Sequence, residues 1–227
     1  MARLPSPSKR AELIKTRIVS IEPEAAELAA AGDVARALLE GGVAAYPTET
    51  FYALGSAAFS RPAVHKIYRL KERDASKPLP FIVADMDMLG GLVAELPPGF
   101  AALAAEFWPG PLTLVLPAAS RLPEHVLGPG RTIAVRLPPL AWLRGLVRDL
   151  GEPLTATSAN LAGGRELADP AEVRALFEGR VEIVVDGGPA PGGQPSTIVD
   201  LSGEKPRVLR EGRIPAARIE AVLRGST

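Results

Sequence analysis

Short apolar runs alternate along the chain with longer stretches in which apolar residues recur every three or four positions. The short runs have the length of strands, and the longer stretches have the period of helices. The expected strands are 17–21, 43–46, 79–83, 112–116, 132–137, 154–157, 181–186, 196–201 and 207–210. The expected helices are 25–40 (interrupted at Gly32-Asp33), 61–71, 85–95, 98–107, 139–150, 170–178 and 215–223. Because strands and helices are mixed without a linker or repeat, we expect one α/β domain, a twisted mixed sheet flanked by helices.

The N-terminal segment differs in character from the rest of the chain. Residues 1–16 are polar and contain two prolines, so we expect a flexible tail before a domain that covers 17–227. The tail is basic and lacks the apolar stretch of a secretory signal. No run of about 18 apolar residues occurs anywhere, which predicts no membrane span and a cytoplasmic protein.

Composition removes several kinds of chemistry. The 227 residues are 47% apolar and 23% charged, as in soluble globular proteins, and 26 Lys and Arg balance 26 Asp and Glu. Any anion binding must therefore come from a local cluster of charge rather than from the whole molecule. The absence of cysteine excludes disulfides and thiolate chemistry. No phosphate-binding P-loop pattern occurs, and His65 and His125 lack the spacing of metal ligands.

A strand that ends in hydroxyl groups is the first candidate for a ligand site. The apolar run 43–46 meets Pro47, and Thr48 and Thr50 follow before a turn closed by Gly55. Hydroxyl groups at a strand end can bind a polar ligand because each both donates and accepts hydrogen bonds.

Three cations follow at the end of the predicted helix 61–71. Lys71, Arg73 and Lys77 would hold a polyanion such as a triphosphate, since Arg binds phosphate through two N–H groups and Lys acts as a point charge. The helical period places Lys71 at the end of the buried stripe. A solvated, charged helix end, partly neutralised by Glu72 and Asp74, would account for the same spacing.

The strand 132–137 carries a charged residue among apolar ones. The two-residue period of a strand places Thr132, Ala134 and Arg136 on one face. A buried Arg must be paired. Its partner is either a substrate carboxylate or a carboxylate of the protein itself.

Small and polar residues also lie at the ends of three other predicted strands. They are Thr155 to Asn160, the segment 195–200 with Ser196, and the segment 208–212 with Arg210. Open α/β sheets bind ligands where strand ends converge, which predicts a site in a concave surface there. Taken singly, each segment could equally be a capped or surface turn. The Gly- and Pro-rich loop 187–195 is long enough to cover such a site.

Seven short motifs occur in an order that resembles the YrdC family over about residues 25–223. They are Pro-Thr-Glu-Thr (47–50), Lys-x-Arg (71–73), Lys-Pro-Leu (77–79), Val-Arg-Leu-Pro (135–138), Ser-Ala-Asn (158–160), Pro-Ser-Thr-Ile-Val-Asp (195–200) and Leu-Arg-x-Gly (209–212). The family includes threonylcarbamoyl-AMP synthases. These enzymes convert L-threonine, bicarbonate or CO₂, and ATP into threonylcarbamoyl-adenylate and pyrophosphate, the first step of threonylcarbamoyladenosine formation in tRNA.

The resemblance implies a YrdC-like fold and a set of site residues. Those implied for threonine are Thr50, Arg136, Ala156 through its backbone, and Ser196. Those implied for ATP are Arg73, Lys77, Thr132, Ser158, Asn160 and Arg210. Lys71, Arg73 and Lys77 would stabilise charge, with no covalent or acid–base catalytic residue. Mg²⁺ would arrive with ATP and take no ligand from the protein. A tRNA threonylcarbamoyl transferase complex would use the product, and tRNA binding would be weak.

The motifs also depart from the family pattern. Many relatives have Asn at the position of Lys77 and His at that of Ile82, while Phe51 and Ala53 replace Val and Gly. We expect the loop 187–195 or the N-terminal tail to act as the lid. Two alternatives stay open: a non-catalytic module that binds double-stranded RNA or tRNA, and a relative that forms a carbamoyl-adenylate with another acceptor.

Overall fold

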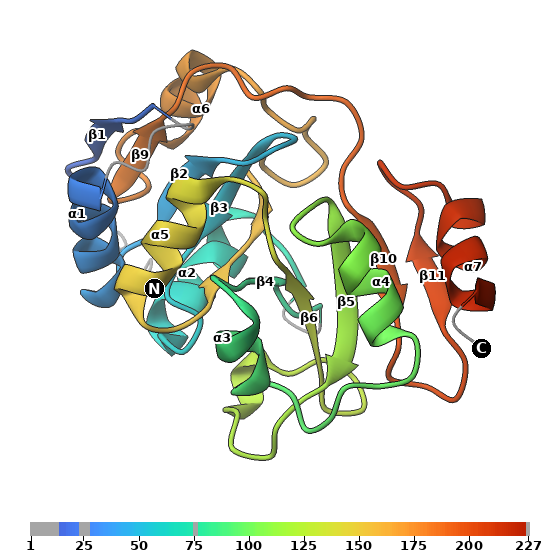
Figure 1. Ribbon diagram of the computed structural model, residues 1–227. Coiled ribbons are helices and arrows are strands. Elements are labelled where there is room, and N and C mark those ends of the chain that lie inside the picture. The colour runs from blue at the N-terminus through green and yellow to red at the C-terminus, as the bar shows by residue number, and fades with distance from the viewer. Residues whose placement is uncertain (1–13, 23–27, 75–76, 226–227) are drawn as a thin grey trace, which may run out of the picture.

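The computed structural model describes residues 14–22, 28–74 and 77–225 (Figure 1). The predicted tail lies mostly outside these residues. The elements are β1 (Arg17–Ser20), α1 (Leu28–Leu39), β2 (Ala44–Pro47), β3 (Tyr52–Gly55), α2 (Arg61–Leu70), β4 (Phe81–Ile82), α3 (Met86–Gly90), α4 (Phe100–Phe107), β5 (Leu112–Pro117), the 3₁₀ turn η1 (Glu124–Val126), β6 (Thr132–Arg136), α5 (Ala141–Leu150), β7 (Leu154–Thr155), β8 (Thr157–Ser158), α6 (Pro170–Phe177), β9 (Ile183–Asp186), β10 (Thr197–Asp200), β11 (Arg207–Arg210) and α7 (Ala216–Gly225).

The strands of the described residues form two mixed sheets. The five-stranded sheet has the order β1-β9-β2-β3-β8, and the six-stranded sheet has the order β11-β10-β5-β6-β4-β7. In Figure 1, β1, β9, β2 and β3 lie on the left, and β6, β5, β10 and β11 on the right. The mixed α/β class in a single domain is confirmed, but the strands divide between two sheets where the sequence predicted one.

The segment 154–158 contributes one short strand to each sheet, so the chain passes directly from one sheet to the other there. β7 pairs with β4 through Leu154 opposite Ile82, whereas β8 pairs with β3 through Thr157 opposite Leu54. Ala156 alone separates the two strands. A pattern of apolar runs predicts one strand over 154–157 because it carries no information about which neighbour each residue pairs with.

Helices cover both faces of the five-stranded sheet. One buried cluster joins Val34 and Leu38 of α1 and Leu146 of α5 to Tyr46 of β2. A second cluster, on the other face, joins Ile67 of α2 and Phe177 of α6 to Tyr52 and Leu54 of β3. Both faces of β2 and β3 are therefore covered, and all four residues of each strand are buried.

In the central part of the six-stranded sheet, helices pack against one face and leave the other face uncovered. Leu103 of α4 and Ile219 of α7 pack against Leu114 of β5 and Val199 of β10 in a third buried cluster. Figure 1 shows α4 and α7 beside these strands. Ile133 and Val135 of β6 belong to the same cluster, so Arg136 lies on the opposite face, as the two-residue period of the strand predicted.

The largest secondary-structure difference is the hairpin formed by β2 and β3. The sequence predicted only a turn after Tyr46, yet Tyr46 pairs with Ala53 and Ala44 with Gly55 in an antiparallel ladder. A Cβ at Gly55 would lie 2.1 Å from the carbonyl oxygen of Thr155, so only glycine lets the hairpin approach the segment 154–158 so closely. The loop 48–51 that connects the two strands carries both threonines of the Pro-Thr-Glu-Thr motif.

Smaller differences have local causes. α1 runs through Gly32 and Asp33 without a break because it packs along α5. α3 stops at Gly90, short of the predicted end at residue 95, because Ala94 N donates to Pro117 O at the end of β5. Ser60 begins α2 as predicted, although its side chain makes no capping hydrogen bond.

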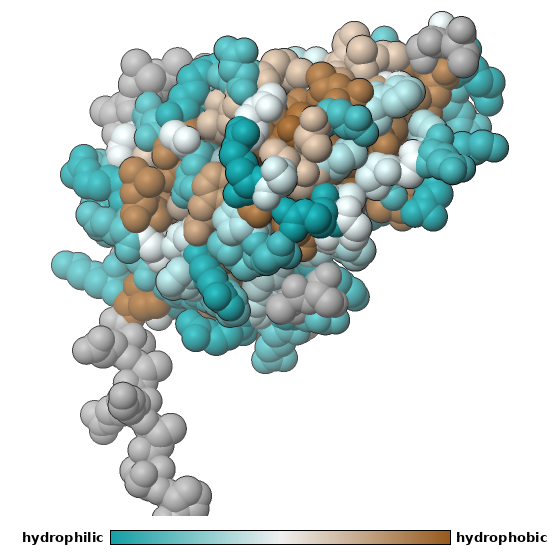
Figure 2. Space-filling model, turned by 90° about the horizontal axis from the view of Figure 1, so that it is seen from below, coloured by the Kyte–Doolittle hydropathy of each residue, from teal (hydrophilic) through white to brown (hydrophobic). Residues whose placement is uncertain are grey.

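Exposed large apolar side chains are scattered over separate elements of the described chain. They are Ile18, Leu39, Met86, Leu96 and Leu209. Figure 2 shows the face seen from below, where hydrophobic patches are interspersed with hydrophilic side chains. In the part of the chain that the structure describes, every helix is too short or too polar to cross a bilayer.

Candidate active site

A cleft of about 200 Å³ lies where the two sheets meet. Thr48, Thr50 and Phe51 line it from the β2–β3 loop, and Ala156 and Ser158 line it from the segment that joins the sheets. The six-stranded sheet contributes the face that its helices leave open. Its lining residues are Ile82 of β4, Thr113 of β5, Arg136 of β6, Ile198 of β10 and Arg210 of β11. Strand ends from both sheets thus converge on one cavity, as the sequence predicted.

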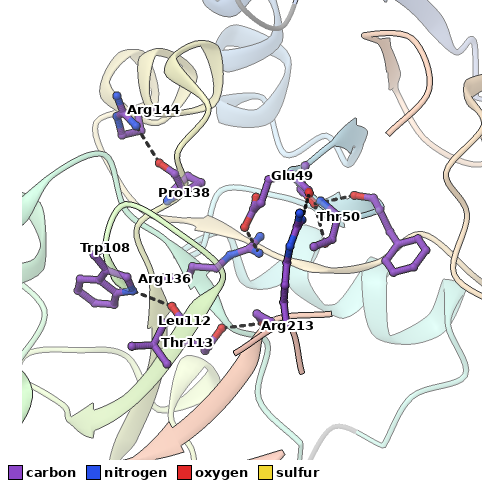
Figure 3. A network of polar contacts seen from close by, with 12 residues as sticks. Glu49, Thr50, Trp108, Leu112, Thr113, Arg136, Pro138, Arg144 and Arg213 are labelled. Atoms are coloured by element: carbon purple, nitrogen blue, oxygen red, sulfur yellow. Dashed lines mark hydrogen bonds and ion pairs between the residues drawn. The ribbon is translucent and has the colours of Figure 1, made fainter. Parts of the chain in front are cut away.

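Arg136 and Glu49 form a buried ion pair at this cleft. Arg136 Nη1 donates to Glu49 Oε1 at 2.6 Å, and the two side chains are 9% and 10% exposed. Figure 3 shows Arg136 reaching from β6 toward Glu49 in the β2–β3 loop. Of the two alternatives left open for Arg136, the structure shows the carboxylate partner within the protein, and Arg136 also lines the cleft.

Hydrogen bonds fix the shape of the β2–β3 loop. Thr48 Oγ1 donates to the Phe51 carbonyl at 2.6 Å and accepts from Thr50 N at 3.3 Å. Gly192 N donates to the Thr50 carbonyl at 2.6 Å, which ties the loop 187–195 to the hairpin. Thr50 is 5% exposed and lines the cleft, as its implied role requires.

Ser196 and Arg210 lie together on the opposite wall. The hydroxyls of Ser196 and Thr113 are 3.0 Å apart. Arg210 Nη2 donates to the Ser196 carbonyl at 2.8 Å, and burial lowers the pKa of its guanidinium while the charge of Glu166 opposes that shift. Ala156, near the junction of the sheets, donates its N–H to Pro80 O at 2.8 Å. Its carbonyl is therefore the backbone group that a ligand amine would use.

Lys71 is buried beside the cleft and organises the Ser-Ala-Asn turn. Its Nζ donates to the carbonyl of Ser158, to Oδ1 of Asn160 at 2.5 Å and to the carbonyl of Asn160 at 3.0 Å. Burial, reinforced by the charge of Arg73, lowers the pKa of Lys71 to about 8, and the charge of Glu166 acts in the other direction. Lys71 is 7% exposed, which excludes the solvated helix end for this residue.

Of the other implied nucleotide residues, some line the cleft and some do not. Arg73 and Ser158 line it, and Arg73 Nε donates to the Lys77 carbonyl at 3.1 Å. Lys77 is exposed, and neither it nor Asn160 belongs to the lining. Thr132 lies at the start of β6, four residues or about 13 Å along the strand from Arg136. Its hydroxyl donates to Pro129 O, so the structure does not bring Thr132 to the cleft.

The structure adds residues that the sequence analysis did not select. Glu49 lies within the Pro-Thr-Glu-Thr motif but was not assigned a role, although a carboxylate between two threonines was a visible signal. Glu166 lines the cleft, and its charge acts on both Lys71 and Arg210. Thr113 and Ile198 line the cleft because they alternate with the core residues of their strands, a signal available only once each strand's buried face is known.

A second hollow lies between α3 and the loops around Leu122 and Glu152. It is larger, about 570 Å³, and mainly apolar, with Arg121 as the cation among its lining residues. Arg121 is engaged by the carbonyl of Gly91. Of these two hollows in the described part of the chain, the cleft between the sheets is the one that combines several cations with hydroxyl groups. The described residues include no group of three or more His, Asp or Glu side chains placed to hold a metal ion.

Fold and cleft together define a mixed α/β protein with a cleft between two sheets that is lined by several cations and hydroxyl groups. A family model described as "Telomere recombination", for the Sua5, YciO and YrdC proteins, matches residues 36–212. The chain belongs to this family.

Named relatives are threonylcarbamoyl-AMP synthases. That of Pyrococcus abyssi is 39% identical over 184 residues, which make up 81% of this chain and 54% of the relative. That of Bacillus subtilis is 38% identical over 187 residues, which make up 82% of this chain and 54% of the relative. That of Thiobacillus denitrificans is 39% identical over 168 residues, which make up 74% of this chain and 89% of the relative. The chain thus spans about half the length of the first two relatives and most of the third.

Solved structures of relatives have the same fold. The crystal structure of P. abyssi Sua5 complexed with L-threonine superposes with a TM-score of 0.85 at 37% identity, covering 91% of this chain and 61% of that chain. Escherichia coli YciO superposes with a TM-score of 0.79 at 27% identity, covering 90% of this chain and 98% of that one. These matches confirm the YrdC-like fold expected from the ordered motifs.

Proposed function

We propose that this protein is a threonylcarbamoyl-AMP synthase, which forms L-threonylcarbamoyladenylate and pyrophosphate from L-threonine, bicarbonate or CO₂, and ATP. One observation carries the proposal. A single cleft holds Thr50, Arg136 and Ser196, implied for threonine, together with Arg73 and Arg210, implied for ATP. The names of the relatives and the threonine complex of P. abyssi Sua5 support the same assignment.

The cations of the cleft divide into two subsites. Arg136 lies on β6 beside the β2–β3 loop and would bind the threonine carboxylate, with Thr50 and Ser196 near its amine and hydroxyl. Arg73 and Arg210 lie on other segments of the cleft wall and would bind the triphosphate. The two substrates would thus be held with the amino group and the α-phosphate facing each other.

The reaction needs two bond-forming steps. The neutral amine of threonine attacks CO₂, a C–N bond forms, and the amine gives up a proton as the carbamate appears. A carbamate oxygen then attacks the α-phosphorus, and the bond from that phosphorus to the bridging oxygen breaks as pyrophosphate leaves. The protein would contribute positioning and charge stabilisation rather than a covalent intermediate. Lys71 would hold Ser158 and Asn160 in place beside the nucleotide.

A magnesium ion bound to ATP would neutralise part of the phosphate charge when present. Single carboxylates near the phosphates fit magnesium, which keeps several of its waters and takes few protein ligands. Glu166 lines the cleft and its charge acts on Lys71 and Arg210, but the described residues offer no set of carboxylates for a dedicated site. The residues present therefore fit an ion brought in by the nucleotide.

Two departures from the family pattern bear on this cleft. Ile82 lines it with an apolar side chain where many relatives have His, so any contact made by that His must come from another group here. Lys77 is exposed, and its carbonyl rather than its ammonium binds Arg73.

The product is a mixed anhydride that water destroys, so a later enzyme must take it over quickly. We propose that a tRNA threonylcarbamoyl transferase is that enzyme, with the loop 187–195 as the cover over the cleft in between. The hydrogen bond from Gly192 N to the Thr50 carbonyl supports this role, because it ties the loop to the β2–β3 loop.

Pyrophosphate release tests the proposal. Purified protein is supplied with ATP, Mg²⁺ and bicarbonate, with and without L-threonine, and with L-serine as a competing acceptor. We expect release that requires threonine and exceeds release with serine. Nucleotide binding without threonine-dependent release would favour another acceptor. Salt-sensitive RNA binding without any release would favour the non-catalytic RNA-binding alternative.

A further inference from the structure

Glu49 does not line the cleft itself, but its side chain forms an ion pair with Arg136, which does. It lies in the β2–β3 loop of one sheet, and its partner Arg136 lies on β6 of the other. The two residues are 87 positions apart in sequence, yet Nη1 and Oε1 are only 2.6 Å apart. The pair therefore joins the two walls of the cleft through a single charge-assisted hydrogen bond.

The guanidinium of Arg136 has donors to spare. Arg carries five N–H groups in a planar fork, and among the described residues Glu49 is the hydrogen-bond acceptor of this guanidinium. Since Arg136 also lines the cleft, its remaining N–H groups are available to a ligand there. A carboxylate that met two of them would form the bidentate geometry that Arg favours.

Glu49 itself has no other partner for its side chain among the described residues. Its Oε2 is buried and without a hydrogen bond, whereas its backbone carbonyl accepts from Arg213 Nη1 at 3.1 Å. A buried carboxylate oxygen left without a donor is costly, so a carboxylate that served only the fold would be expected to have more partners. The side chain of Glu49 is thus dedicated to Arg136, while Arg213 anchors its backbone.

The β2–β3 loop also carries Thr50, next to Glu49 in sequence and 5% exposed in the cleft. Fixing Glu49 against Arg136 fixes the position of Thr50 relative to the guanidinium. We propose that Glu49 is the positioning residue of the amino-acid subsite. It orients Arg136 so that two free N–H groups face the substrate carboxylate, and it sets the spacing between that carboxylate and Thr50. The inference rests on the proposed function.

Two possible roles for Glu49 predict opposite changes in threonine binding when its charge is removed. If Glu49 only neutralised Arg136, removal of its charge would leave the cleft more positive and would strengthen binding of the threonine carboxylate. If Glu49 positions Arg136, the same change weakens threonine binding because the guanidinium loses its fixed orientation. The direction of the change in threonine KM separates the two roles.

Glu49→Gln tests the inference because it keeps the shape of the side chain and removes its charge. We expect the threonine KM to rise about tenfold, with the KM for ATP changed less than about twofold. Glu182→Gln is the matched control, since Glu182 is also a partly buried carboxylate and pairs with Lys66 at 2.5 Å, but Lys66, unlike Arg136, does not line the cleft. We expect this control to leave both KM values unchanged.

A double variant distinguishes positioning from a general loss of structure. In an Arg136→Lys background the planar fork is already absent, so Glu49→Gln should raise the threonine KM by less than about twofold further. An unchanged or lowered threonine KM in Glu49→Gln, or an equal rise of both substrates' KM values, would overturn the inference. Wild-type protein without threonine-dependent pyrophosphate release would instead overturn the proposed function itself.

Discussion

Lys71 at the end of α2 donates a 2.5 Å hydrogen bond to Oδ1 of Asn160, two residues beyond β8. The same ammonium also binds the carbonyls of Ser158 and Asn160. One buried cation thereby holds the turn that places Ser158 in the cleft wall. This contact links a helix and a strand end that the sequence separates by 89 residues, and it explains why a lysine lies under the cleft rather than in solvent.

Replacement of Lys71 by Met should release that turn. Hydrogen bonds to a charged donor contribute about 1.5–3 kcal/mol each, so we expect the KM for ATP to rise by about tenfold or more. The KM for threonine should change much less, because Arg136 and Thr50 belong to other segments. Lys66→Met is the control: Lys66 lies on the same helix and pairs with Glu182 outside the cleft. Equal effects of the two variants on ATP would contradict the role given to Lys71.

The lowered pKa of Lys71, about 8, predicts a pH dependence of nucleotide binding. Below that pH the ammonium is present and holds the turn. As the pH rises from about 7 to about 9 the proton is lost, and nucleotide affinity should fall severalfold. Calorimetric titration of a non-hydrolysable ATP analogue measures this directly. Lys71→Met should show a flat profile over the same range, and a fall of similar size in that variant would show that another group titrates.

Stability should respond to the same proton in the opposite direction. The folded pKa of Lys71 lies below the ordinary lysine value of 10.5, so the folded state releases the proton before the unfolded state does. The stability of wild type relative to Lys71→Met is therefore lowest below about pH 8 and increases as the pH rises from there toward 10.5. Urea unfolding of both proteins at several pH values checks the sign, and a difference that decreases over this range would contradict it.

Arg210 and Arg207 lie on the same strand, β11, but only Arg210 lines the cleft. Arg210→Ala should raise the KM for ATP about tenfold, because a phosphate contact by a guanidinium is charge-assisted. Arg207 pairs with Asp200 at 3.2 Å on an exposed surface, where ion pairs contribute about 0–1 kcal/mol. Arg207→Ala should therefore leave the kinetics unchanged. Steady-state kinetics with varied ATP measure both, and an equal response would remove Arg210 from the nucleotide subsite.

Gly55→Ala should destabilise the fold through the β2–β3 hairpin. The added Cβ would lie 2.1 Å from the Thr155 carbonyl oxygen and 2.7 Å from a ring carbon of Tyr46, both in the core. Such overpacking costs about 1–3 kcal/mol or more, to be measured as a lower urea midpoint. Gly145→Ala, in the middle of α5 with nothing within 4 Å, should instead gain up to about 1 kcal/mol. A neutral Gly55→Ala variant would contradict the close approach of the hairpin.

Apolar periodicity predicted most of the helices and strands, because each buries one face or both in a way that a local pattern records. The position of Lys71 at the end of a buried stripe and the face of Arg136 on its strand followed from such local periods. The division into two sheets did not, since it depends on Leu154 pairing with Ile82 while Thr157 pairs with Leu54. Pairing partners so distant in sequence leave no trace in a local pattern.

The residues of the cleft show the same limit of prediction from the sequence. The family resemblance implied roles for Thr50, Arg73, Arg136, Ala156, Ser158, Ser196 and Arg210, and all of them line one cavity. It also implied a role for Thr132, which lies at the other end of β6 from Arg136 and outside the lining. The sequence did not predict a role for Glu49, because that role depends on its ion pair with Arg136. The pair forms only when the two sheets have folded against each other.

Detection of the product tests the central claim most directly. Protein is incubated with ATP, Mg²⁺, L-threonine and isotopically labelled bicarbonate, and the adenylate fraction is analysed immediately by mass spectrometry. We expect a species that contains AMP, threonine and the label together, that is lost without threonine and that is reduced in Arg136→Lys. Adenylate that carries the label without threonine, or pyrophosphate release without any labelled adenylate, would contradict the assignment of this cleft to threonylcarbamoyl-AMP synthesis.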